Sequence, residues 1–146
     1  MATVNSLEYA NSVASPPVMN APNTRGKLIR QRFSYTVAAV VAAGTVIVLG
    51  VLPANSRFFG GVWSNDTTWS GGSTLVALGV TGTAAKFHAG INTSGAVDQT
   101  AFGVTAALGG GGIYVPTADI LLIATTADVA IVTGGTCWGW FDYVLA

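Results

Sequence analysis

Few side chains of this sequence are of types that could do chemistry, and they lie far apart. The one histidine, His88, stands in the segment Lys86-Phe87-His88-Ala89, and the one cysteine is Cys137. A catalytic histidine or cysteine needs a base or an orienting partner, yet there is no Gly-x-Ser-x-Gly motif and no base that can be assigned to Cys137. We therefore predict that the protein is not an enzyme. We expect His88 to be a surface or loop residue and Cys137 to be a small buried hydrophobe.

The acidic and glycine-rich segments also lack the spacing of a ligand site. No Asp-x-Asp spacing of the kind found in calcium loops occurs among the downstream aspartates, which are Asp66, Asp98, Asp119, Asp128 and Asp142. The four glycines of Gly109–Gly112 lack the Lys-Ser/Thr pair of a phosphate-binding loop. A single cysteine excludes an intramolecular disulfide and a Cys-based zinc cluster. We predict no bound metal and no cofactor.

Four of the six cations fall within eight residues and raise the question of a membrane. Arg25, Lys27, Arg30 and Arg32 precede an uncharged stretch at 33–56. A cationic flank followed by roughly 20 apolar residues is the pattern of a membrane anchor. The stretch does not stand out, however, because 51% of the whole chain is hydrophobic and only 8% is charged. We expect strands of one domain and no membrane partner, with a membrane-anchored protein as the less favoured alternative.

The same cluster could contact the phosphates of a nucleic acid. The net charge of the chain is zero, so no overall field attracts a polyanion. The nearest aromatic residues, Phe33 and Tyr35, fall on the apolar face of the expected strand and not beside the cations. A sheet edge protected by cations against unwanted pairing explains the cluster equally well. We predict no nucleic-acid partner.

Residues 1–24 form a compositional unit, which we expect to be an extended N-terminal arm. This segment holds one charge, Glu8, and three of the five prolines, without helical periodicity. Leu7, Tyr9 and Val13 are apolar side chains that it could bury. A loose terminus and an arm ordered against a neighbouring subunit are equally open.

From residue 28 the hydrophobic period becomes two, which is typical of β-strands. Over 28–37 it places Phe33 and Tyr35 on one face and Arg30 and Arg32 on the other. Further strands are predicted at Thr45–Leu52, Arg57–Ser64, Thr74–Thr81, Ile113–Val115, Ile120–Thr125, Val129–Thr133 and Thr136–Leu145. Residues 82–112 break the pattern, with one or two helical turns expected at Ala84–Ala89. Seven or eight short strands predict an all-β fold, a single antiparallel β-sandwich over 25–146 for which a jelly roll is one arrangement.

The last predicted strand carries the largest side chains. Trp138 and Trp140 fall on one face with Asp142, and Cys137 and Phe141 fall on the other. Aromatic residues on both faces indicate either a central strand in the core or a strand whose outer face meets a partner. Trp138 and Trp140 are therefore candidates for an oligomer interface, because tryptophan is enriched at binding hot spots.

The scarcity of charged residues indicates the kind of environment in which the protein works. A typical soluble domain carries about 25% charged residues, whereas this chain carries 8%. Thr, Gly, Ser and Asn supply its polarity, and such groups are desolvated at lower cost than ions. This composition suits a protein that is packed in an assembly.

The order of short motifs resembles the small structural proteins of tailed-bacteriophage virions, in particular capsid decoration (cement) proteins. The motifs are a Met-Ala-Thr-Val-Asn-Ser opening, Arg-Gly-Lys at 25–27, Gly44-Thr45-Val46 running to Leu52-Pro53-Ala54, Arg57, Thr74-Leu75 through Gly79, and the aromatic last strand. The resemblance implies a non-enzymatic β-sandwich protein on the outer face of the head shell, in the form of a trimer. Its partners would be further copies of itself and the major capsid protein.

A mechanism follows from this resemblance as a hypothesis. The arm and the basic strand would contact neighbouring capsid subunits and stabilise the assembled shell, through Leu7, Tyr9, Val13, Arg25, Lys27, Arg30 and Arg32. Another virion component, such as a shell subunit, a tail protein or a host-binding module, is the alternative.

Overall fold

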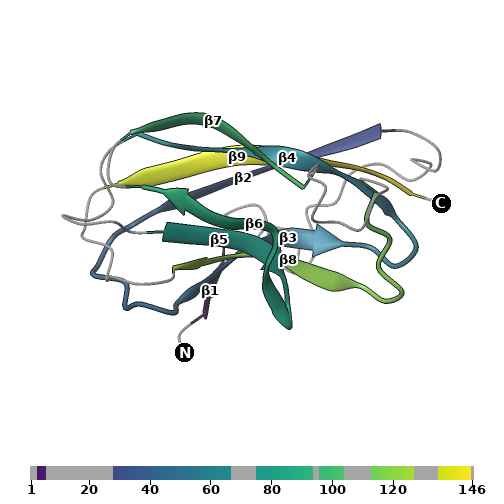
Figure 1. The fold of residues 1–146 in the computed structure, drawn as a ribbon, viewed down its shortest axis with the longest axis horizontal. Coiled ribbons are helices and arrows are strands. Elements are labelled where there is room, and N and C mark those ends of the chain that lie inside the picture. The colour runs from purple at the N-terminus through teal and green to yellow at the C-terminus, as the bar shows by residue number, and fades with distance from the viewer. Residues whose placement is uncertain are drawn as a thin grey trace, which may run out of the picture.

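The structure, a computed structural model, describes residues 3–5, 28–66, 75–93, 96–103, 113–126 and 135–145. In these residues every regular element is a strand, and the strands form two facing layers (Figure 1). They are β1 (Thr3–Asn5), β2 (Leu28–Thr36), β3 (Val46–Leu52), β4 (Arg57–Asn65), β5 (Leu75–Val80), β6 (Thr83–Asn92), β7 (Val97–Phe102), β8 (Ile120–Thr126) and β9 (Thr136–Val144). The all-β sandwich expected from the sequence is confirmed. The described part contains no helix long and apolar enough to cross a membrane.

The two sheets are built from nested pairs of strands. One sheet has the order β1-β3-β8-β5-β6 and the other the order β2-β9-β4-β7. β5 pairs with β6, β4 with β7, β3 with β8 and β2 with β9, all antiparallel. Only β1, added beside β3, is parallel to its neighbour among the described strands. The chain from β2 to β9 is therefore arranged as one long hairpin folded over on itself.

Period-two alternation in β2 and β9 decides which side chains fill the space between the sheets. Phe33 of β2 and Cys137 and Phe141 of β9 are buried, whereas Arg30 and Arg32 are exposed. This is the alternation expected for a strand with one face on the core.

Phe58 lies at the centre of the core. Its ring centroid is 4.5 Å from that of Phe87 in the facing sheet. It is also 6.4 Å from the ring centroids of Phe102 and Phe141, in the other strands of its own sheet. One aromatic cluster thus joins the two sheets, and its partners come from β6, β7 and β9.

The strands predicted at 28–37, 45–52, 57–64, 74–81, 120–125 and 136–145 are confirmed within one or two residues. The helical turns expected at Ala84–Ala89 are wrong, since these residues lie in β6, and 82–112 contains two strands, β6 and β7. Alanine favours helix intrinsically, but pairing with β5 and burial of Phe87 and Ile91 override that preference.

Two further predicted segments have different outcomes. In 113–115 the structure has only an isolated bridge between Tyr114 and Phe58 instead of a strand. The strand predicted at 129–133 lies outside the described residues, as does the boundary between the arm and the sandwich at residues 24 and 25.

Candidate functional site

The outer face of the β2-β9-β4-β7 sheet gathers the charged and aromatic residues that the sequence singled out. Arg30 lies opposite Asp142, and Arg32 lies opposite Trp140, in the antiparallel register of β2 and β9. On the other side of β9, Val62 of β4 lies opposite Trp140. Directly opposed residues of an antiparallel pair project to the same side of the sheet. We call Arg30, Arg32, Val62, Trp138, Trp140 and Asp142 the outer aromatic face.

Gly139 explains how two tryptophans fit on adjacent outward positions of one strand. It lies between Trp138 and Trp140 and faces the interior, where a Cβ atom would overlap the carbonyl oxygen of Val62 and approach the Phe33 ring. A glycine here lets β4 and the Phe33 ring approach β9 closely. The large side chains of this segment are consequently on the solvent side.

Arg30 is held in a fixed position on the outer aromatic face. Its Nε and Nη2 donate hydrogen bonds of 2.8 Å to the two carboxylate oxygens of Asp142. Its guanidinium carbon also lies 5.0 Å from the centroid of the Trp140 ring, in cation–π geometry. The hydrogen bond to Asp142 raises the pKa of Arg30 above its usual value. The pair is locally neutral, so Arg32 is the exposed cation of this face that has no carboxylate partner within the described part of the chain.

Trp138 is the most exposed aromatic side chain of this face. It is 42% exposed, and Leu28, at the end of the same side of β2, is 61% exposed. Trp140 is only half-buried, beneath the Arg30 side chain. A large amphipathic ring left in solvent on a face that also carries arginine has the composition of a protein-binding hot spot.

The remaining predicted contact residues are Leu7, Tyr9, Val13, Arg25 and Lys27, and all five lie outside the described residues. The structure therefore brings together Arg30, Arg32, Trp138 and Trp140, four of the nine residues proposed from the sequence. Their adjacency was not predicted from the sequence. The hydrophobic period of a strand shows which of its residues share a face, but not which strand lies next to it.

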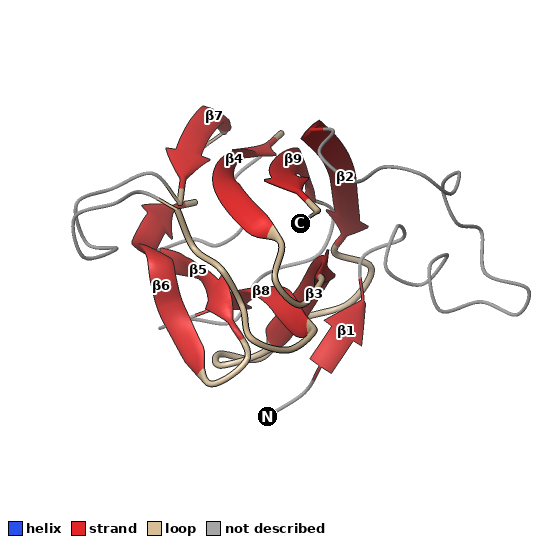
Figure 2. Cartoon of the chain, turned by 90° about the vertical axis from the view of Figure 1, so that its right-hand side faces the viewer, coloured by secondary structure: helices blue, strands red, loops and turns tan. Residues whose placement is uncertain are grey.

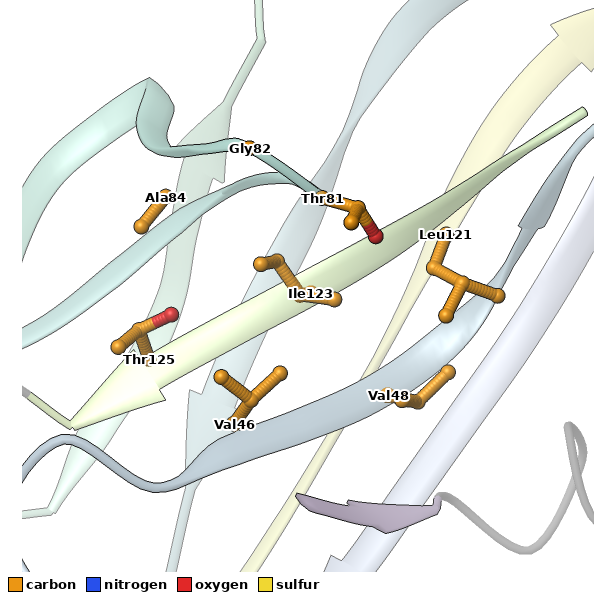
Figure 3. Close-up of a pocket in the computed structure, with 8 residues that line it drawn as sticks. All are labelled: Val46, Val48, Thr81, Gly82, Ala84, Leu121, Ile123 and Thr125. Carbon is orange, nitrogen blue, oxygen red and sulfur yellow. The ribbon is translucent and has the colours of Figure 1, made fainter. Parts of the chain in front are cut away.

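The other sheet carries an apolar groove on its outer face (Figure 3). It has a volume of about 460 Å³ and is lined by Val46, Val48, Thr81, Gly82, Ala84, Leu121, Ile123 and Thr125. None of these side chains titrates or acts as a nucleophile at neutral pH, so the groove offers packing and not catalysis. The groove was not predicted, because the runs 45–52 and 120–125 are almost wholly apolar and show no alternation that would mark a solvent-facing side.

The side chains that could take part in chemistry, His88 and Cys137, do not come together in one site. His88 is half-buried in strand β6, and its Nδ1 accepts a hydrogen bond of 3.1 Å from the backbone nitrogen of Gly90. Cys137 is fully buried, as predicted. In the described ranges no three His, Cys, Asp or Glu residues come together in a way that could hold a metal ion.

Neither a protein-family model nor a curated protein sequence matches the chain. Solved structures share its fold. A chain in the capsid of Ralstonia phage GP4 superposes with a TM-score of 0.75 at 20% identity, over 99% of both chains. A chain of the cyanophage Pam1 capsid asymmetric unit has a TM-score of 0.61 at 15% identity, over 91% of this chain and 96% of that chain.

A third similar chain belongs to the acid-stable capsid of the Helicobacter pylori bacteriophage KHP30. Its TM-score is 0.51 at 13% identity, with 81% of this chain and 95% of that chain covered. Identities this low establish a common fold and nothing finer.

Proposed function

We propose that this protein is a non-enzymatic structural component of a bacteriophage virion, of the capsid decoration (cement) type. The observation that carries the proposal is the fold shared over 99% of both chains with a protein in the capsid of Ralstonia phage GP4. The sequence motifs that resemble decoration proteins point the same way. A groove and an outer aromatic face suited to packing support a structural role.

The strand order supports the jelly-roll form of the sandwich. Four nested antiparallel pairs, divided between two sheets in the orders β2-β9-β4-β7 and β3-β8-β5-β6, are what a rolled-up hairpin of eight strands produces. A rigid roll of this kind suits a protein that serves as a fixed bridge between neighbouring subunits.

The proposed site of action is the exterior of the head shell, with the major capsid protein as partner. Trp138 would be the anchor in an apolar hollow of the shell, and Arg32 would face acidic capsid surface. The arm, through Leu7, Tyr9, Val13, Arg25 and Lys27, would add contacts to adjacent subunits. A protein that binds only the assembled shell stabilises the shell by mass action.

Several copies held together, as a trimer, would strengthen weak individual contacts through avidity. The competing assignment is another virion component, such as a shell subunit, a tail protein or a host-binding module. The number of copies per particle separates them, since a cement protein approaches the stoichiometry of the shell protein and a tail protein does not.

The proposal is tested by adding the purified full chain to assembled heads that lack it. We expect saturable binding near shell stoichiometry, and greater resistance of the heads to heat or to chelators. Trp138→Ala should lower the affinity at least tenfold without changing the unfolding temperature, as loss of a hot-spot tryptophan does. The control is Val40→Ala, which shortens a 67% exposed side chain in the connection between β2 and β3.

Deletion of residues 1–24 tests the role of the arm. We expect a folded protein that binds heads much more weakly than the full chain. Full occupancy by the truncated protein would refute the arm contacts, whereas failure of the full chain to bind any head preparation would refute the decoration role itself.

A further inference from the structure

The first strand is attached to the sandwich in a different way from the others. β1 lies beside β3 at the edge of its sheet (Figure 2). It has three residues and is parallel to β3, with Thr3, Val4 and Asn5 opposite Val46, Ile47 and Val48. Each residue of so short a pair contributes about one hydrogen bond with a net value of roughly 1 kcal/mol. Ordering each residue costs about as much. The pairing in one isolated chain is therefore close to balance.

The strand that β1 covers needs protection along that edge. β3 has the sequence Val-Ile-Val-Leu-Gly-Val-Leu, without charge or proline. β1 covers only its first half, and no described strand pairs with Gly50–Leu52 on that side. An apolar, uncharged sheet edge accepts added strands readily. β3 is thus an acceptor for an extended segment, and β1 is the segment that fits it.

The length of chain between β1 and β2 allows β1 to pair either with β3 of its own copy or with β3 of an adjacent copy. Residues 6–27 connect the two strands, and they can span roughly 70 Å when extended. A domain of this size has a diameter on the order of 35 Å. The tether therefore reaches the β3 strand of an adjacent copy as well as its own.

We propose that β1 of one copy adds to the β3 edge of a neighbouring copy, so that the assembled protein is linked by strand exchange. The proposal rests on the proposed function only in assuming that several copies lie side by side. Clustering raises the effective concentration of neighbouring strands into the millimolar range, and an exchanged strand makes the same hydrogen bonds as an unexchanged one. Exchange therefore links copies without a new interface having to be built.

Single-cysteine variants distinguish exchange from pairing within one chain. Thr3→Cys and Val46→Cys are made in separate full-length proteins, which are mixed at about 1 mM and oxidised with a glutathione buffer. The native Cys137 is fully buried and does not compete. We expect a covalent heterodimer on non-reducing gels. Position 3 is in register with position 46 in the β1-β3 pair, so cysteines on two different chains meet there only when β1 of one copy lies on β3 of the other.

The matched control mixes Thr3→Cys with Thr83→Cys, an exposed position on β6 at the opposite edge of the same sheet. A second pair, Asn5→Cys with Val48→Cys, is used if Val46→Cys does not fold. A heterodimer yield several-fold above that of the control supports exchange. A yield no higher than the control overturns it, even more clearly if the doubly substituted Thr3→Cys/Val46→Cys chain forms only an internal disulfide.

Head binding by the unmodified protein is measured separately. Binding without cross-linking overturns strand exchange and leaves the decoration role standing. Cross-linking without binding overturns the decoration role and leaves strand exchange standing.

Discussion

Arg30 and Asp142 lie directly opposite one another in β2 and β9, although 112 positions separate them in the sequence. Two hydrogen bonds of 2.8 Å join them, one to each carboxylate oxygen. This two-point geometry fixes the plane of the guanidinium group over the Trp140 ring. Arg30 thus positions an aromatic surface, and it is not the free cation that the basic cluster suggested.

Asp142→Asn should uncover Trp140 with little effect on the unfolding temperature, because exposed ion pairs add little stability. Loss of one charged acceptor releases the guanidinium group from its fixed plane. The measurement is quenching of tryptophan fluorescence by acrylamide, which is neutral and insensitive to the changed charge. We expect quenching to increase in Asp142→Asn but not when Trp140→Phe is also present. An unchanged quenching constant would contradict the positioning role.

Two neighbouring threonines should respond in opposite ways to replacement by valine. Thr126 is buried, and its Oγ1 accepts from the backbone nitrogen of Thr45 and donates to the carbonyl oxygen of Ala42, both at 3.1 Å. The buried Oγ1 of Thr125 has no hydrogen-bond partner within the described residues. Thr126→Val should lower the free energy of unfolding by about 1–3 kcal/mol. Thr125→Val should leave it unchanged or raise it, and urea titrations of both variants under identical conditions check this.

Adjacent phenylalanines provide a matched pair for the core. Phe58 is fully buried in the aromatic cluster, whereas Phe59 is 38% exposed. Phe58→Ala should cost about 3–5 kcal/mol of unfolding free energy, and Phe59→Ala less than about 1 kcal/mol. If Phe58→Ala does not fold, Phe58→Leu provides a graded test. Equal losses at the two positions would contradict the placement of Phe58.

Stability should decline in alkaline solution because of a half-buried tyrosine, Tyr143. Burial raises the pKa of Tyr143 above the ordinary value of 10.0. Burial is also the largest cause of the raised pKa of Tyr35. The neutral phenol is favoured in the folded state, so its contribution is complete below the unfolded pKa, about 10. That contribution is lost as the pH rises through the folded pKa. Tyr143→Phe should flatten this decline in urea titrations between about pH 8 and 11, and a slope equal to that of the native protein would exclude Tyr143 as its source.

The sequence predicted the strands well wherever one face meets the core and the other meets solvent. Over β2, for example, the alternation of Phe33 with Arg32 identified both the strand and its inner face. It failed at Ala84–Ala89, because the alanines there carry no strong hydrophobic period and the decisive contacts, from β5 and the core, are distant in sequence.

The composition of the candidate site was predictable, and its assembly was not. Arg32 was placed on the outer face of its strand, and Trp138 was placed with Trp140 and Asp142 on one face of the last strand. Their meeting on one surface depends on β9 pairing with β2, which lies at the far end of the chain. The local pattern of either strand does not identify a partner so far away in the sequence. The apolar groove was invisible for a related reason, since uncharged runs look alike whether one face or both faces are covered.

The position of β9 has a consequence for how the protein is made. β9 lies between β2 and β4, so the last described strand to leave the ribosome completes the middle of a sheet. Until Thr136–Val144 has been synthesised, β2 and β4 are separated by an empty strand position. Contacts of such long sequence separation slow folding, and unpaired strands invite association between chains. The outer aromatic face therefore cannot form before β9 has paired with β2 and β4, so this surface appears only with the completed sheet.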